Sequence, residues 1–75
     1  NPYEEMILPV LDFDMSKELW SYNSATEILR FIGIEHPTIA QCRECGSVMR
    51  EHFGAPIKYQ GTMKWKIPLK SRFTP

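Results

Sequence analysis

The stretch TIAQCRECGSVMREHFGAPIKYQGTMKWKIP, residues 38–68, decides the expected fold, because its hydrophobic period changes halfway along. In residues 38–53 the apolar side chains recur at helical spacing, and Gly54 can end the helix because glycine tolerates a positive φ. In residues 57–67 the period is two, and Gly61 sits at the bend of a β-hairpin. This stretch therefore predicts a long helix followed by a hairpin.

Each of these two elements is expected to have one apolar and one polar side. The expected core side of the helix carries Cys42, Cys45, Val48, Met49 and Phe53. At 100° per residue, Arg43, Ser47 and Arg50 fall within about 60° of one another on its other side. In the hairpin we expect an apolar face of Ile57, Tyr59, Met63, Trp65 and Ile67, opposite a lysine-rich face of Lys58, Lys64 and Lys66.

Three earlier segments complete the expected order of elements. Ser24-Ala25-Thr26-Glu27 is the clearest helix start, because the serine hydroxyl and the glutamate carboxylate can each bind the other residue's amide. This helix is expected to stop near Gly33. Asn1-Pro2 favours a short or kinked helix over residues 3–11, and the alternating aromatic residues 19–22 indicate a short strand.

The order of helix, short strand, capped helix, longer helix and basic hairpin is that of a winged helix-turn-helix. We expect an α+β fold with about three helices and a small three-stranded antiparallel sheet, in which the hairpin is the wing. Residues 1–75 are expected to form one domain, cut from a longer polypeptide because the chain opens at Asn1 rather than Met. A domain of this size buries only roughly 60% of its unfolded surface, which leaves little room for a deep catalytic cleft. No enzyme activity is expected.

The formal net charge of zero hides an asymmetry along the chain. Residues 1–37 carry seven acidic and two basic side chains, a net charge of −5. Residues 38–75 carry seven basic and two acidic side chains, a net charge of +5. A basic half suggests a polyanionic partner, although segregated charge can also serve only to solvate a surface.

Helix 38–53 is expected to act as a recognition helix, since an α-helix can enter a DNA major groove about 12 Å wide. The residues expected to contact duplex DNA are Gln41, Arg43, Ser47 and Arg50 on the helix, with Lys58, Tyr59, Lys64 and Lys66 on the wing. The lysines would hold phosphates. A protein-interaction domain of the same fold is the alternative, with the acidic half as its docking surface.

Several short motifs also resemble one known family. They are Asn1-Pro2-Tyr3-Glu4-Glu5, Ser24-Ala25-Thr26-Glu27-Ile28-Leu29, Cys45-Gly46-Ser47-Val48-Met49-Arg50-Glu51, Gly61 to Trp65, and Pro68. Together they resemble the carboxy-terminal region of virulence-associated E proteins, the primase- or helicase-like replication proteins of phages and mobile elements. The resemblance implies an upstream ATPase or primase domain that supplies the chemistry, and a tail that helps place it on DNA. Asn1 and Tyr3 depart from that pattern, which more typically has Asp and Trp there.

Two other kinds of site are suggested by the sequence but are less favoured. Cys42 and Cys45, with His36 and His52, suggest a zinc or redox site on paper, but reduced core thiols explain two cysteines on the core side of a helix. The aromatic residues Trp20, Tyr22, Tyr59 and Trp65 could stack on single-stranded bases, although core packing is favoured for the tryptophans. We expect no cofactor and no metal. The apolar runs are far shorter than the roughly 20 residues of a membrane span, and a cytoplasmic location is expected.

Overall fold

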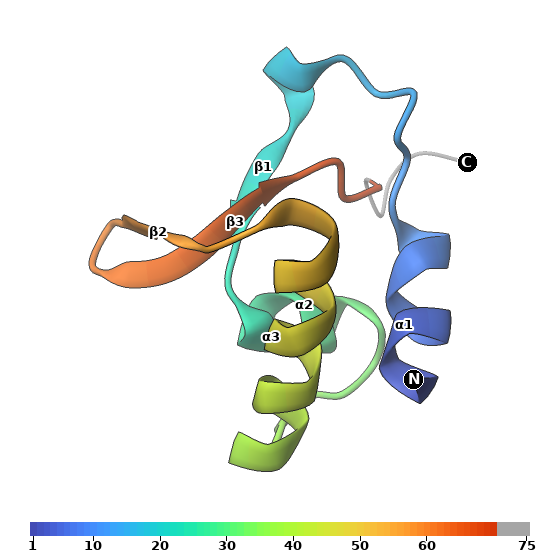
Figure 1. Ribbon diagram of the computed structural model, residues 1–75, viewed down its shortest axis with the longest axis vertical. Helices are drawn as coiled ribbons and strands as arrows, with labels where there is room; N and C mark the ends of the chain where they lie inside the picture. Colours follow the sequence, from blue (N-terminus) through green and yellow to red (C-terminus); the bar gives the residue numbers. More distant parts are fainter. Residues whose placement is uncertain (71–75) are drawn as a thin grey trace.

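The computed structural model describes residues 1–70, and in this part of the chain it shows an α+β fold (Figure 1). Arg72, which was counted in the basic half, lies outside the described residues. The described part has three α-helices, two 3₁₀ turns and three strands: α1 (Pro2–Ile7), η1 (Leu8–Val10), η2 (Lys17–Leu19), β1 (Ser21–Asn23), α2 (Ala25–Phe31), α3 (Ile39–Phe53), β2 (Ile57–Tyr59) and β3 (Thr62–Ile67). None of the helices in residues 1–70 is long and apolar enough to cross a membrane.

The two longer helices begin at capping boxes, as the sequence predicts at the first of them. Ser24 Oγ accepts from the Glu27 amide at 3.2 Å, and Glu27 Oε1 accepts from the Ser24 amide at 3.0 Å. Thr38 and Gln41 make the same reciprocal pair at the start of α3. These bonds satisfy amides that lack a partner in the first helical turn, so the starts of α2 and α3 are fixed locally.

The amino-terminal segment forms the short, interrupted helix that its sequence predicts. Asn1 caps α1 by accepting from the Tyr3 amide at 2.9 Å, and Pro9 lies in the following 3₁₀ turn. The predicted strand 19–22 begins two residues later than expected, at Ser21. Leu19 completes η2, and the Trp20 indole donates to the Met15 carbonyl at 2.9 Å, so this bend is held by its own hydrogen bond.

The strands form one antiparallel sheet in the order β1-β3-β2. β2 and β3 are joined by Gln60 and Gly61, which both have positive φ, 52° and 83°. Positive φ at both central residues is typical of the two-residue type I′ turn that matches the twist of a hairpin. This turn pairs Tyr59 with Thr62 and Ile57 with Lys64.

The predicted division of the hairpin into an apolar and a lysine face is wrong for β2. Paired residues lie on the same face of a sheet, so Ile57 and Tyr59 share a face with Lys64. Lys58 pairs with Met63 and lies on the opposite face. The reason is the length of the turn: with two residues, odd positions of β2 align with even positions of β3, whereas the prediction needed a loop of one or three residues.

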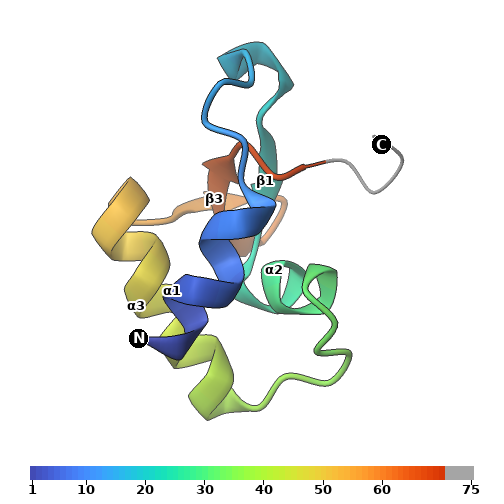
Figure 2. The same ribbon diagram turned by 90° about the vertical axis from the view of Figure 1, so that its right-hand side faces the viewer.

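The helices pack mainly against one face of the sheet, which we call the inner face. The opposite face, the outer face, is more exposed, although Lys64 on it pairs with Glu27 of α2. Trp65 and Ile67 on the inner face are buried in the core. α1 packs on α3 (Figures 1 and 2). The core consists of Ile7, Leu11, Ile28, Leu29, Cys45, Val48, Met49, Trp65 and Ile67. The hairpin projects beyond the helices in Figure 1, which explains why Met63 remains 50% exposed despite facing inward.

Candidate nucleic-acid interface

The exposed side of α3 carries three of the residues predicted to contact DNA. Arg43, Ser47 and Arg50 are all exposed, as their helical spacing predicts. Gln41, the fourth, is half-buried, and its side-chain oxygen accepts from the Thr38 amide at 2.9 Å. Gln41 therefore serves first as the capping partner of α3, and the cationic stripe begins at Arg43.

A groove with a volume of about 430 Å³ runs beside this stripe. It is lined by Thr26, Pro37, Ile39, Cys42, Arg43, Gly46, Arg50 and Trp65. Gly46 forms the floor of the groove, because it has no side chain to fill the space. A Cβ added at Gly46 would lie 3.9 Å from Cη2 of Trp65 and 3.7 Å from Nη1 of Arg50. The groove thus combines two guanidinium groups at its walls with an apolar floor, and the exposed Ile39 extends it toward the start of α3.

One of the predicted hairpin lysines lies on the same side of the sheet as α3. Lys58 is opposite Met63, on the inner face that also carries Trp65. Its side chain is exposed, and no ion pair within residues 1–70 involves it. Together with Arg43 and Arg50, it gives this side of the molecule three cations, which we call the α3-side cations.

The other two hairpin lysines lie on the outer face, so the structure divides the predicted site into two groups. Lys64 Nζ lies 3.2 Å from Glu27 Oε1, and its side chain is only 16% exposed. Lys66 Nζ lies 5.9 Å from the ring centroid of Tyr22, the residue opposite it on β1. Tyr59 stacks on Tyr22 with ring centroids 4.0 Å apart.

The pairing of Lys64 with Glu27 neutralises one of the predicted phosphate ligands. Burial alone would raise the pKa of Glu27, but hydrogen bonds from the Ser24 amide and from Lys64 outweigh it and leave the pKa below its ordinary value. The carboxylate is therefore ionised near neutral pH. Lys64 acts mainly as a partner of the α2 capping box.

Cys45 and His52 contact different parts of the molecule. Cys45, on α3, is buried against the start of α2, where its Sγ lies 3.9 Å from the Ala25 carbonyl oxygen. Burial, with a smaller effect from Cys42, raises the pKa of Cys45 to about 11. His52 Nε2 lies 2.9 Å from Glu4 Oε2. Within residues 1–70 no three His, Cys, Asp or Glu side chains are grouped closely enough to hold a metal ion. The zinc hypothesis therefore gains no support from this part of the chain.

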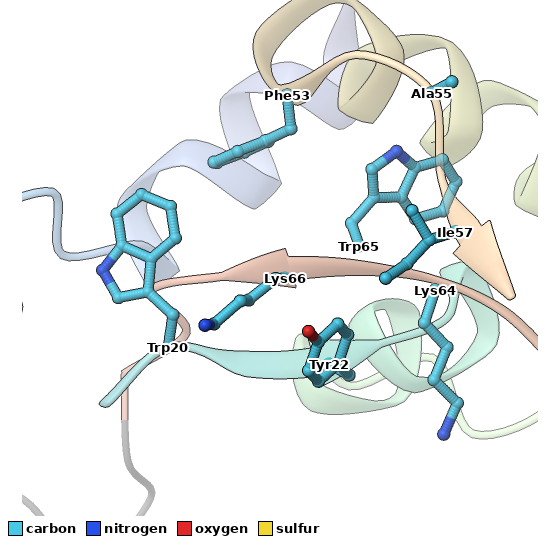
Figure 3. Close-up of a pocket in the computed structure, with 8 residues that line it drawn as sticks. All are labelled: Trp20, Tyr22, Phe53, Ala55, Ile57, Lys64, Trp65 and Lys66. Atoms are coloured by element: carbon cyan, nitrogen blue, oxygen red, sulfur yellow. The ribbon is translucent and has the colours of Figure 1, made fainter. Parts of the chain in front are cut away.

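The sequence did not point to a second groove, of about 340 Å³, beside the outer face (Figure 3). It is lined by Trp20, Tyr22, Phe53, Ala55, Ile57, Lys64, Trp65 and Lys66. Trp20 meets Phe53 edge to face with centroids 6.2 Å apart, and Phe53 stacks on Phe13 at 5.9 Å. The individual aromatic residues were noticeable in the sequence, but their convergence depends on tertiary contacts between segments 30 or more residues apart.

Comparisons with protein-family models, with curated proteins and with solved structures found no match.

Proposed function

We propose that this chain is a non-catalytic, winged-helix module that binds duplex DNA through α3. The observation that carries the proposal is the exposed stripe of Arg43, Ser47 and Arg50 beside an open groove on that helix. The guanidinium group of arginine can donate two hydrogen bonds at once, either to a phosphate or to the O6 and N7 atoms of guanine. A helix whose exposed side is polar and carries two arginines is the kind of element that can enter a major groove.

The order of elements supports the winged-helix assignment. α2 and α3 are consecutive helices, and the β2–β3 hairpin follows α3 directly and projects from the body (Figure 1). Residues 32–38 connect the two helices, a longer connection than the three- or four-residue turn of a typical helix-turn-helix. In this arrangement the hairpin is the wing, and Lys58 is its phosphate contact because it lies on the α3 side of the sheet. Tyr59, Lys64 and Lys66 lie on the outer face. The proposed duplex site therefore consists of the α3-side cations and Ser47 alone.

The resemblance to virulence-associated E proteins supports a role in replication. Under this proposal, the module positions the ATPase or primase domain of a phage or mobile-element replication protein on DNA, in the cytoplasm. The catalytic step would belong to that other domain. The motifs behind the resemblance include the capping box Ser24 to Glu27 and the α3 segment Cys45 to Glu51, which bears Ser47 and Arg50.

The salt dependence of duplex binding tests the proposal quantitatively. Each phosphate neutralised on B-DNA contributes a slope of about −0.9 to log K against log salt. The three α3-side cations therefore predict a slope of about −2.7, whereas all five predicted cations would give about −4.5. Between 50 and 200 mM salt these slopes correspond to affinity losses of about 40-fold and about 500-fold. An absence of duplex binding at low salt, or a salt-independent affinity, contradicts the proposal.

Charge reversal separates DNA binding from the alternative of a protein-interaction domain. Arg50→Glu should abolish retention on duplex DNA, whereas Lys66→Glu makes the same charge change on the outer face and should retain most of it. A protein-interaction role predicts instead that neither variant changes DNA retention. Circular dichroism of both variants checks that they remain folded.

A further inference from the structure

The outer face of the sheet combines aromatic walls with cations at their edges. In the groove of Figure 3, Trp20 and Phe53 stand at one end, and Tyr22 lies beside β3. Trp20 and Phe53 are nearly perpendicular, at 86°, so their rings form two walls of different orientation. Ala55 adds only a methyl group to the lining, which leaves the groove open.

Lys66 lines the groove, and Lys17 lies near Trp20 without being one of the lining residues. Lys66 Nζ lies 5.9 Å from the Tyr22 ring centroid, and Lys17 Nζ lies 5.9 Å from that of Trp20. Both side chains are exposed, so their ammonium groups can exchange a ring contact for a phosphate at little cost. Lys64 bends away from the groove in Figure 3 toward Glu27, and this ion pair makes it a poor phosphate ligand.

Flat apolar walls with cations at the rim fit a nucleobase and its backbone better than they fit a peptide or a lipid. Base stacking on an aromatic side chain is tolerant of sequence, and a positive rim follows the phosphates of a single strand. The volume of about 340 Å³ is near the lower end of the range for small-molecule pockets, which suits one or two ring systems.

The groove also lies next to the proposed duplex site. Trp65 lines both this groove and the groove beside α3, so the two grooves meet at its side chain. A strand that leaves a duplex held by α3 could pass around β3 and place an unpaired base against Trp20 or Tyr22. We propose that the outer-face groove binds an unpaired DNA strand, so that the module prefers a duplex with a single-stranded tail over a blunt duplex.

This inference rests on the proposed DNA-binding function but uses a different set of side chains, so the two can fail separately. Fluorescence anisotropy of the 75-residue chain would measure the affinity for oligothymidylate of about 12 nucleotides, for a blunt duplex and for the same duplex with an oligothymidylate tail. Tyr22→Leu removes the ring but keeps an apolar side chain. Lys66→Glu reverses the rim charge, and Arg50→Glu serves as the control on the other face.

Tyr22→Leu should weaken oligothymidylate binding by about 5-fold or more, since a stacked base contributes roughly 1–3 kcal/mol. Lys66→Glu should also weaken this binding, because it places a negative charge where the phosphates of the strand would lie. Both variants should remove the advantage of the tailed duplex. Arg50→Glu should weaken the blunt duplex and leave oligothymidylate binding nearly unchanged. The inference is overturned if the wild type does not bind oligothymidylate, or if only Arg50→Glu weakens that binding. Oligothymidylate binding through the outer face without any duplex binding would overturn the proposed function and keep the single-strand site. Lys66→Gln, which keeps the polar side chain, provides a second test if Tyr22→Leu fails to fold.

Discussion

Replacing Gly46 by alanine should stabilise the domain, although the residue is buried beneath the α3 groove. Gly46 lies in the interior of α3, and its added Cβ would meet its nearest neighbours at 3.7 and 3.9 Å, which are ordinary van der Waals distances. No atom has to move. Glycine costs about 0.5–1 kcal/mol relative to alanine in a helix interior, mainly because the unfolded glycine has more conformational freedom.

This gain should raise the midpoint of thermal unfolding by about 2–8 °C, because 1 kcal/mol corresponds to roughly 4–8 °C in a domain of this size. Gly54→Ala is the matched control. Gly54 ends α3 with φ 81° and ψ −160°, a conformation that is essentially restricted to glycine, so the same added methyl group should cost about 1–3 kcal/mol. Thermal unfolding followed by far-ultraviolet circular dichroism measures both. A lower midpoint for Gly46→Ala, or equal shifts in the two variants, would refute the packing described beneath the groove.

Three further outcomes are expected. Ser24→Ala removes the hydroxyl of the capping box and should lower the free energy of unfolding by about 0.5–2 kcal/mol in urea titrations; an unchanged midpoint would mean that the cap does not hold α2. Because folding lowers the pKa of Glu27, its carboxylate stabilises the fold at neutral pH, and this contribution is lost as the pH falls below the usual glutamate value and through the lowered one. Urea titrations between pH 6 and 3 should therefore show a smaller acid-dependent loss in Glu27→Gln than in the wild type, and parallel curves would contradict the lowered pKa of Glu27. Iodoacetamide should alkylate Cys45 only on unfolding, because the thiol is fully buried and its pKa is raised to about 11; mass spectrometry that finds Cys45 modified in the native protein would contradict its position.

The positions of the helices could be predicted from the sequence because their signals are local. A capping box needs only four consecutive residues, and the reciprocal bonds between Ser24 and Glu27 follow from that spacing alone. The end of α3 at Gly54 is likewise a property of the backbone at one residue. The three helices, the hairpin and the three-stranded sheet all fall where the order of these signals predicts.

The side chains that share each face of the hairpin could not be predicted, because a change of one residue in the length of the turn moves every side chain of β2 to the opposite face. With Gln60 and Gly61 as the only two turn residues, the whole of β2 is shifted by one position relative to the alternative that aligns its apolar residues with those of β3. This shift places Lys58 alone on the α3 side. The same pairing register places Tyr59 on the face of the sheet that carries Tyr22, and the two rings stack. The sequence alone does not predict this contact.

The central claim is that duplex DNA contacts the α3 side and not the outer face of the sheet. Titration of the isotope-labelled chain with a blunt duplex, followed by amide chemical shifts in nuclear magnetic resonance spectra, tests it most directly. The largest changes should fall at Arg43, Ser47, Arg50 and Lys58, with small changes at Lys66. Changes concentrated at Lys66 and β1, or no changes at all, would contradict it.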